Sequence, residues 1–429
     1  MIIVDTALRK RASKGKPIRV AVVGAGFMGK GLVHQIIGSI TGMDVVALSN
    51  RTVAEARKAY EIAGVDDAVH AETQAQIEDA VRSGKPCYTE DALAMCGAAG
   101  IDAVIEATGE VEFGLHAVLA SIDTGKHVVL MNAELDALLG PLLKHRADKA
   151  GVVITNVDGD QPGVVMNLFR FVDSIGYQPV LAGNIKGLQD HYRNPTTQKG
   201  FADQHGQKPK MITSFADGTK ISMEMAVVAN ATGFRVSTRG MHGKECKHVT
   251  EAVNLFDVDE LLEHGIVDFV LGAEPGPGVF VLGYNDNPVK QQYMRYLKMG
   301  DGPLYVFYVP YHLPHLEAPL TVARAVLFDD AATKPLGGPV AEVITVAKTD
   351  LEAGVELDGI GGYHCFGEID NAALCRENDF LPMSLAEGCK LRAPIAKDTP
   401  ITLSDVELPD GRLVDKLWQE QLDLFRQNG

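Results

Sequence analysis

The sequence predicts an α/β protein: a doubly wound, Rossmann-type parallel sheet, then an α+β domain and a small β domain. Three observations support this. Short β-branched apolar runs alternate with helical patterns over about the first 160 residues, and a glycine-rich turn follows the first run. Beyond that point strands and helices mix, with many Gly and Pro. A chain of 429 residues exceeds one ordinary core, so two or three domains are expected.

The first domain alternates strands and helices in the order of βαβ units. Its expected strands are the apolar runs 18–24, 44–50, 101–109 and 126–132. Its expected helices are 27–38, 53–63, 73–81, 110–125 and 138–150, with another in "EDALAMCG" for which Thr89 is the expected N-cap. This rhythm indicates a parallel sheet with helices on both faces.

The domain boundaries follow changes of pattern. We expect a dinucleotide-binding domain over 1–160 and an α+β substrate-binding and catalytic domain over 161–333. In the second, 164–175 looks helical and "PVLAGNIKG" is typical of a strand that enters a loop. The stretch "KPLGGP" is a candidate linker to a β domain over 338–429, whose tail "VDKLWQEQLDLFRQNG" has the pattern of an amphipathic helix.

Composition excludes several classes of protein. A net charge of −16 disfavours binding to nucleic acid or anionic membranes, although a local basic pocket for a small anion stays open. No apolar run reaches the length of a membrane span, and the N-terminus places its apolar residues before its charges, unlike a signal peptide. We therefore expect a cytoplasmic protein. The six cysteines are scattered without a CxxC pair, as in a protein with reduced thiols.

The turn after the first strand has the spacing of a dinucleotide-binding loop. "GAGFMG" places Gly24, Gly26 and Gly29 in the G-x-G-x-x-G pattern between a strand and a helix, with Phe27 and Met28 in between. The first glycine permits a tight turn, the second lets the backbone approach a pyrophosphate, and the third lets the helix pack on the strand. The helix N-terminus then offers free N–H groups to the phosphates. A purely structural turn is the alternative.

The end of the second strand selects the cofactor. A carboxylate here would bind the ribose 2′-hydroxyl of NAD. The sequence has Ser49, Asn50, Arg51 and Thr52 instead, a guanidinium among neutral hydrogen-bonding groups. This combination favours the 2′-phosphate of NADP, unless Arg51 is simply a solvated loop cation.

Two later strands end in polar residues at the same edge of the sheet. "EATG" brings Thr108 and Gly109, and "MNAE" brings Asn132 and Glu134, to the edge where ligands of open α/β sheets bind. Caps at helix starts would explain Asn132 and Glu134 as well. The candidate cofactor-binding residues are Gly24, Gly26, Phe27, Met28, Gly29, Asn50, Arg51, Thr108, Gly109 and Asn132.

The stretch "GNIKGLQDHYRNP" gathers charges at the end of a buried strand. Reduction of a carbonyl needs a proton donor, and a lysine suits this role when burial lowers its pKa. We expect Lys186 to be that donor and Asp190 to orient it, which makes these two the candidate catalytic residues. Arg193 could clamp an anion, or Asp190 and Arg193 could form an ion pair that pins the loop. His191 is the least favoured of the group.

Two further stretches supply polar groups for a substrate. "NVDGDQPG" places Asp158 and Asp160 where they could hold substrate hydroxyls or a divalent ion, although turn chemistry explains them equally. "NATGFRVSTRGMHGKE" could form an anion cradle or a basic surface loop. The candidate substrate-binding residues are Arg193, Arg239, His242, Asp160 and Glu134. A requirement for a divalent metal stays open.

Several motifs together resemble a known bacterial family. "RKRASKGKPIRVAVVGAGFMG", "GNIKG", "MAVVANATG", "AKTDLEAGVELDGIGGY" and "LPMSLAEGCKLRAPIAKD" are similar to proteins with a homoserine-dehydrogenase-like body and a C-terminal SAF-type domain. The resemblance covers essentially the whole chain. The family includes 1-deoxy-D-xylulose 5-phosphate reductoisomerase-like enzymes and oxidoisomerases of branched sugar acids. True homoserine dehydrogenases usually have a lysine directly after the asparagine of the fifth strand, where this chain has Ala133.

The resemblance implies an NADPH-dependent oxidoreductase acting on a small anionic or polyol substrate. The expected reaction converts 1-deoxy-D-xylulose 5-phosphate to 2-C-methyl-D-erythritol 4-phosphate, or transforms a closely related sugar phosphate. An oxidoisomerase or dehydrogenase of a branched sugar acid, and a homoserine-dehydrogenase-like enzyme, are the alternatives. A further alternative, from a different functional class, is that the chain is a SAF-type binding or chaperone protein with a vestigial nucleotide fold. The resemblance also implies a homodimer or a higher homo-oligomer.

Overall fold

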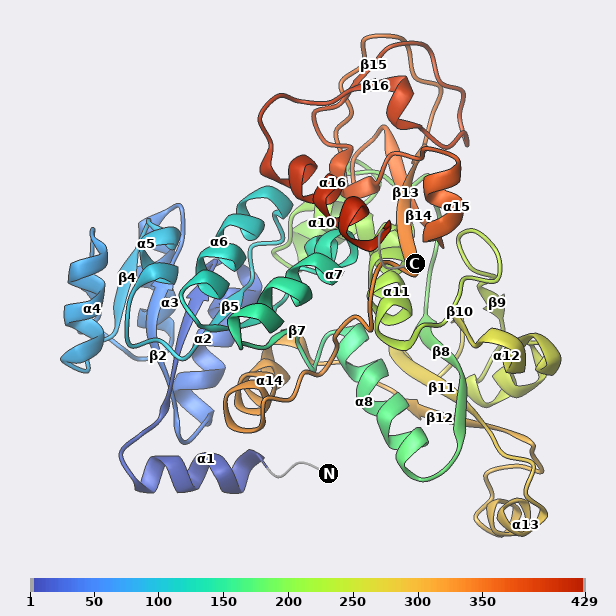
Figure 1. Cartoon of the computed structure of the whole chain (residues 1–429), viewed down its shortest axis with the longest axis horizontal. Helices are drawn as coiled ribbons and strands as arrows, with labels where there is room; N and C mark the ends of the chain where they lie inside the picture. Colours follow the sequence, from blue (N-terminus) through green and yellow to red (C-terminus); the bar gives the residue numbers. More distant parts are fainter. Residues whose placement is uncertain (1–3, 427–429) are drawn as a thin grey trace. The chain divides into compact units, whose positions relative to one another are not determined.

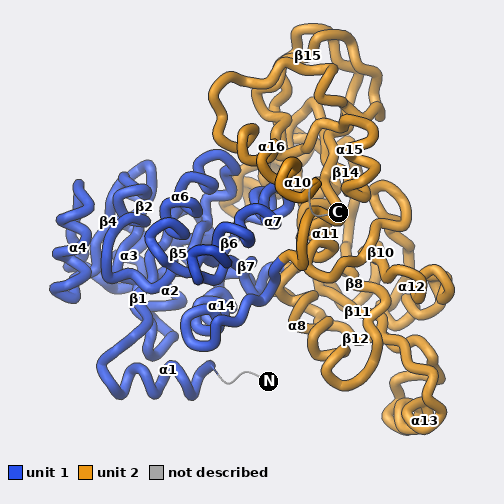
Figure 2. The backbone as a smooth tube through the Cα atoms, in the orientation of Figure 1, with its two compact units in different colours: residues 1–160, 313–334 blue, residues 161–312, 335–429 orange. Residues whose placement is uncertain are grey.

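The computed structural model describes residues 4–426, so residues 1–3 and the last three residues of the predicted tail helix, 427–429, lie outside it. The chain forms two compact units (Figures 1 and 2). Unit 1 comprises 1–160 and 313–334, and unit 2 comprises 161–312 and 335–429. The division at residue 160 coincides with the change of pattern in the sequence, whereas the return of the chain to unit 1 has no sequence signal.

Unit 1 contains a seven-stranded sheet in the order β3-β4-β2-β1-β5-β6-β7, in which every pair of neighbours is parallel. Its strands are β1 (Ile18–Val23), β2 (Met43–Ser49), β3 (Val69–His70), β4 (Cys87–Thr89), β5 (Ala103–Glu106), β6 (His127–Leu130) and β7 (Ile154–Asn156). The predicted Rossmann-type sheet is thus confirmed. The sequence patterns predict only β1, β2, β5 and β6, because two or three residues are too few to show a periodicity.

The helices of unit 1 flank this sheet. They are α1 (Val4–Ser13), α2 (Phe27–Ser39), α3 (Val53–Ile62), α4 (Gln74–Arg82), α5 (Ala92–Gly97), α6 (Val111–Asp123), α7 (Ala133–Ala150) and α14 (Pro314–Phe328). Two predicted helix starts are wrong. Thr89 ends β4, and Asp91 caps α5 by accepting a hydrogen bond from the Ala94 N–H. Helix α7 begins at Ala133 instead of near residue 138, because Asn132 caps it through the Leu135 N–H.

Helix α14 joins unit 1 although it follows the second domain in the sequence. It packs on α2 and β6, and its apolar residues Ala318 and Val322 belong to the core that β1 and β2 build. Arg324 of the same helix forms a buried ion pair with Asp158, which follows β7. The expected boundary at residue 333 therefore divides the chain differently from the structure. Contacts between segments so far apart in the sequence leave no local pattern.

Unit 2 contains a mixed five-stranded sheet in the order β12-β11-β8-β10-β9. Strand β8 runs parallel to β10 and antiparallel to β11. The strands are β8 (Gln178–Lys186), β9 (Lys244–Glu245), β10 (Ile266–Leu271), β11 (Gly278–Tyr284) and β12 (Leu304–Val309). Helices α8 (Gln161–Ser174) and α11 (Thr219–Thr232) pack on the sheet, whereas η1 (Val249–Asn254) and α12 (Val258–His264) contribute to a core that includes Ile185. The other helices of this part are α9 (Lys199–Gln204), α10 (Pro209–Ala216) and α13 (Pro288–Tyr296).

The segment 335–429, the C-terminal segment, belongs to the same unit. Its elements are β13 (Ala341–Ala347), β14 (Cys365–Asn371), α15 (Ala372–Glu377), η2 (Met383–Leu385), β15 (Lys390–Leu391), η3 (Leu403–Asp405), β16 (Val406–Glu407) and α16 (Leu413–Arg426). Strands β13 and β14 pair antiparallel and both pack on α11, and the Gly367 N–H donates to the Thr219 hydroxyl (2.9 Å). This segment is rich in short strands, as expected. It is part of the same compact unit as residues 161–312, although Ile344, Val346, Phe366 and Cys375 form a small hydrophobic cluster within the segment itself.

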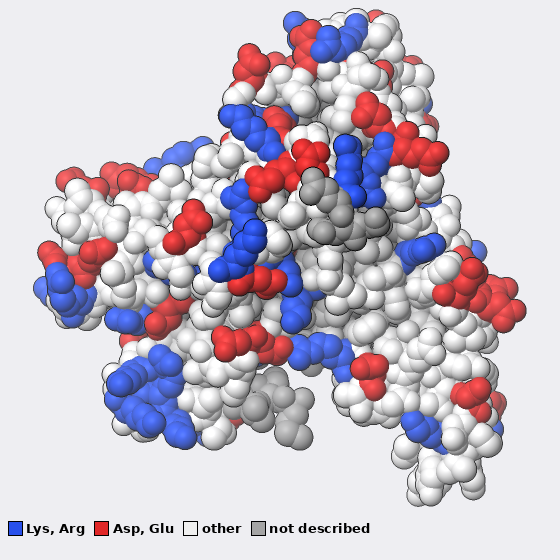
Figure 3. Space-filling model, viewed as in Figure 1, with Lys and Arg blue, Asp and Glu red and all other residues white. Residues whose placement is uncertain are grey.

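Charge is unevenly distributed over the molecule. Figure 3 shows basic side chains gathered over α1, whose sequence includes Arg9, Lys10 and Arg11, although the whole chain carries a net charge of −16. Within residues 4–426, no helix combines the length and apolar character that a membrane span needs.

Candidate active site

The glycine-rich loop of unit 1 has the geometry that a dinucleotide requires. Gly24 has φ +104°, and a Cβ there would lie 3.0 Å from the Ala107 carbonyl oxygen. A Cβ on Gly29 would lie 2.0 Å from the Gly24 carbonyl oxygen, whereas a Cβ on Gly26 would meet nothing within 4 Å. Helix α2 begins directly after Gly26 without a side-chain cap. The open face at Gly26 and the uncapped N–H groups therefore fit a pyrophosphate.

Asn50 and Arg51 have different roles at the end of β2. The Asn50 side chain accepts a hydrogen bond from the Ala25 N–H (3.0 Å) and donates one to the Thr52 carbonyl (2.9 Å), so it holds the glycine-rich loop in place. Arg51 is exposed, and its side chain forms no hydrogen bond or ion pair with any other residue that the structure describes. Its guanidinium is therefore available for a phosphate.

A buried carboxyl organises the loop after β5. Glu106 is fully buried and accepts hydrogen bonds from both the Thr108 N–H (2.8 Å) and the Thr108 hydroxyl. Burial raises the pKa of Glu106, while the Thr108 hydrogen bonds act in the opposite direction. Gly109 follows with φ +69°. Asn132 lies two residues after β6, caps α7 and donates to the Glu110 carbonyl (3.1 Å). The cap explanation therefore holds for Asn132, and Glu106 is a residue of this edge that the sequence analysis missed.

In unit 2, Lys186 ends β8 and points away from the core that contains Ile185, because successive side chains of a strand alternate between its faces. Its ammonium donates to the Phe215 carbonyl (2.7 Å). The next two carbonyls along the chain, those of Ala216 and Asp217, also accept hydrogen bonds from residues shortly after Lys186. The Asp190 N–H donates to Ala216 (2.8 Å), and the His191 ring nitrogen Nδ1 contacts the carbonyl of Asp217 (2.8 Å).

The electrostatic environment of Lys186 comes from residues that the sequence analysis missed. Burial lowers the pKa of Lys186, and the negative charges of Glu224 and Asp217 oppose that shift. Asp217 is fully buried, and Glu224 lies on α11, which is buried on every side from Thr219 to Ala231. A signal was present, since Lys220 and Glu224 stand four residues apart in an otherwise mostly apolar helix. Charged residues in such a helix need partners.

The structure does not bring together Lys186 and the carboxylate expected to orient it. Asp190 accepts from its own loop instead, through the Tyr192 N–H (3.1 Å) and the Arg193 guanidinium (3.0 Å). The ion pair that pins the loop is therefore the observed arrangement. Arg239 pairs with Asp370 (2.8 Å) and lies 4.8 Å from the ring of Phe380.

His242 is held away from Lys186. Its Nδ1 lies 2.8 Å from the carboxylate of Asp268, a fully buried residue of β10. Its ring contacts Phe256, a member of the same core as Ile185, with ring centroids 6.1 Å apart. Lys186 points to the opposite face. The expected cradle of Arg239 and His242 thus does not form around Lys186.

The acidic candidates of unit 1 are Asp158, Asp160 and Glu134. Asp158 pairs with Arg324, and its N–H donates to the Thr321 hydroxyl (2.7 Å), which fastens α14 to the end of β7. Asp160 is the last residue of the first stretch of unit 1, and Glu134 is buried in the first turn of α7. Within residues 4–426, no group of three or more His, Cys, Asp or Glu side chains is arranged to hold a metal ion.

Comparison with known families places this site in context. Residues 159–318 match a family model described as "Oxidoreductase DRL, catalytic domain". The match includes Lys186, Asp217 and Glu224, and ends before the C-terminal segment. No curated protein matched the sequence. The match and the glycine-rich loop support an NAD(P)-dependent oxidoreductase.

Solved structures give a more general likeness. A probable dehydrogenase from Thermotoga maritima is 12% identical, with 75% of this chain and 91% of that chain covered and a TM-score of 0.43. Apo scyllo-inositol dehydrogenase from Lactobacillus casei is 14% identical, with 75% of this chain and 90% of that chain covered and a TM-score of 0.41. A DOX-P reductoisomerase in complex with magnesium is also 14% identical, with 73% of this chain and 70% of that chain covered and a TM-score of 0.40. These low values indicate only a general likeness. The homoserine-dehydrogenase-like and SAF-type characters stay predictions.

Proposed function

We propose that the protein is an NADPH-dependent oxidoreductase that reduces the carbonyl group of a small phosphorylated or polyhydroxylated substrate. The observation that carries the proposal is Lys186. It is a half-buried lysine with a lowered pKa, at the end of a strand, within the region that matches an oxidoreductase catalytic domain. The glycine-rich loop and Arg51 would hold the pyrophosphate and the 2′-phosphate of the cofactor.

The chemistry assigned to the chain is proton transfer. When bound, the cofactor would supply the hydride. The ammonium of Lys186 would donate a proton to the oxygen that becomes an alkoxide, because a lysine with a lowered pKa transfers its proton more readily near neutral pH. Glu224 and Asp217 would keep enough of the lysine protonated for this step, since both raise its pKa.

Within this class we propose 1-deoxy-D-xylulose 5-phosphate as the first substrate to test. This rests on the resemblance of the sequence motifs. The assay follows NADPH consumption with this substrate and with aspartate semialdehyde. In the oxidising direction it follows NADPH formation from NADP with homoserine and with apionate. Turnover of the sugar phosphate would support the specific reaction. Turnover of apionate alone would favour the branched-sugar-acid alternative, and turnover of none with an intact fold would contradict the proposal.

Cofactor choice is tested separately by titration with NADPH and NADH. Arg51→Ala is expected to weaken NADPH binding by about tenfold or more, because it removes a charged partner of the 2′-phosphate, and to leave NADH binding nearly unchanged. Equal affinities of the wild type for both cofactors would contradict the preference for NADP. The matched control is Arg57→Ala, because Arg57 lies on the following helix and pairs with Glu61.

A further inference from the structure

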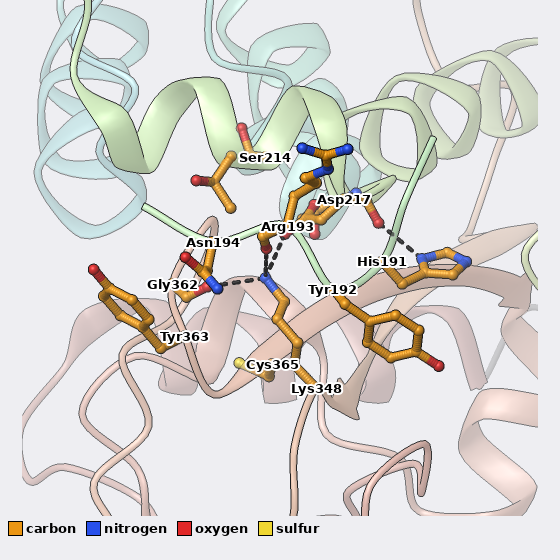
Figure 4. A network of polar contacts seen from close by, with 12 residues as sticks. His191, Tyr192, Arg193, Asn194, Ser214, Asp217, Lys348, Gly362, Tyr363 and Cys365 are labelled. Carbon is orange, nitrogen blue, oxygen red and sulfur yellow. Dashed lines mark hydrogen bonds and ion pairs between the residues drawn. The ribbon is translucent and has the colours of Figure 1, made fainter. Parts of the chain in front are cut away.

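The C-terminal segment reaches into the region that carries Lys186. Lys348 follows β13, and its side chain is only 2% exposed. Its ammonium makes three hydrogen bonds, to the Arg193 carbonyl (2.8 Å), the Asp217 carboxylate (2.9 Å) and the Gly362 carbonyl (2.9 Å). An ammonium has three N–H donors, so all of them are used. Figure 4 shows the side chain directed at these groups.

Two of these three partners, Arg193 and Asp217, belong to the two pieces of chain that meet at Lys186. One is the loop 186–193, which Lys348 contacts at its far end through Arg193. The other is the turn 215–217, whose three carbonyls accept from Lys186, Asp190 and His191. Lys348 binds the Asp217 side chain of that turn, which is 0% exposed. One ammonium therefore connects both pieces and neutralises a carboxylate that acts on Lys186.

Three other contacts connect the C-terminal segment to this loop and to the residues directly after it. The Tyr192 hydroxyl donates to the Asp398 carboxylate (3.0 Å), and the hydroxyls of Thr196 and Tyr363 lie 2.9 Å apart. The His191 ring stacks on Phe366, with centroids 4.4 Å apart. All three partners come from the C-terminal segment. Lys348 differs from them because it is buried, charged and bonded to both pieces of chain.

We propose that Lys348 is a positioning residue, which holds the loop 186–193 against the turn 215–217 and thereby makes the C-terminal segment part of the catalytic region. A buried ion pair adds little net stability, because desolvation offsets the attraction, so a role in specifying geometry is its better explanation. This assignment rests on the proposed function for the role of Lys186. The contacts themselves do not depend on it.

The test measures Lys186 directly and needs no substrate. The pKa of Lys186 is obtained from the pH dependence of its acetylation by acetic anhydride, located by mass spectrometry, and the opening of the loop from amide hydrogen exchange over 186–193. In Lys348→Met, the charge of Asp217 is no longer neutralised, so the pKa of Lys186 is expected to rise. Loop exchange is expected to speed up by about tenfold, the effect of losing one to two hydrogen bonds.

A second variant covers the case in which an unpaired buried charge prevents folding. Lys348→Met/Asp217→Asn removes both charges, so the pKa of Lys186 is expected to fall below the wild-type value, since one of the two carboxylates that raise it is gone. Glu224 is present in both variants. Faster loop exchange is still expected, because the bond to Arg193 is lost.

Lys390→Met is the matched control, because Lys390 is an exposed lysine of the same segment. It should leave both readouts at their wild-type values. The proposal is overturned if exchange over 186–193 stays at the wild-type rate in the double variant, because loss of the Asp217 charge alone changes the pKa of Lys186. An absence of turnover with every substrate would contradict the proposed function alone, because neither readout here depends on catalysis.

Discussion

Substitutions at Gly26, Gly29 and Gly38, in α2 and the loop before it, can distinguish an effect on cofactor binding from an effect on folding. A Cβ on Gly26 would meet nothing within 4 Å, although this residue stands where a pyrophosphate would approach the backbone. Gly26→Ala is therefore expected to weaken NADPH binding while the protein stays folded. The prediction depends on the inference that this open space belongs to the cofactor.

The magnitudes follow from opposing local effects. Alanine is a poorer N-cap than glycine, but it restricts the unfolded chain, and the two effects nearly cancel, leaving a change in the free energy of unfolding of less than about 1 kcal/mol. A methyl group between the backbone and a phosphate removes close N–H contacts. We expect the Kd for NADPH to rise at least about tenfold, equivalent to ~1.4 kcal/mol.

The measurements are fluorescence titration with NADPH and chemical unfolding of the free protein. Gly38→Ala is the control, because this exposed glycine at the other end of α2 also has nothing within 4 Å of a Cβ. It should stabilise the helix by about 0.5–1 kcal/mol and leave the Kd unchanged. Gly29→Ala, with a Cβ 2.0 Å from a carbonyl oxygen, should impair both folding and binding. Wild-type NADPH affinity in Gly26→Ala would refute the cofactor site.

Three further predictions concern single side chains. Lys186→Met should lower turnover by about a hundredfold or more. Because only the ammonium form donates a proton, the wild-type rate should fall as pH rises through the lowered pKa of Lys186, and a flat profile would argue against the role. Burial raises the pKa of Glu342 to about 7, so the wild type loses stability as pH rises from about 5 to 8. As pH rises over that range, the free energy of unfolding of Glu342→Gln should increase by on the order of 2–3 kcal/mol relative to that of the wild type, measured by urea unfolding. Arg324→Met should lower the free energy of unfolding by about 3 kcal/mol, because it leaves Asp158 buried without this charged partner, and an unchanged Tm would contradict that.

Local patterns predicted much of the fold because their causes are local. Strand β1, the glycine-rich turn and α2 follow from apolar runs and glycine spacing within about twenty residues of chain. Strands β3, β4 and β7 could not be predicted this way, since two or three residues carry no periodicity. The position of α14 in unit 1 depends on a core contact and an ion pair across more than a hundred residues.

The candidate site divides in the same way. The sequence by itself determined that Gly24, Gly26 and Gly29 form a tight turn between a strand and a helix and that Lys186 ends a buried strand, because each property depends on neighbours in the chain. Only the tertiary structure decided which groups surround that lysine. Asp190 is engaged within its own loop. Asp217 and Glu224, seven residues apart, act on the lysine, and Lys348 reaches Asp217 from the C-terminal segment. Electrostatic interactions act through distance in space, and that distance is set by how the segments pack.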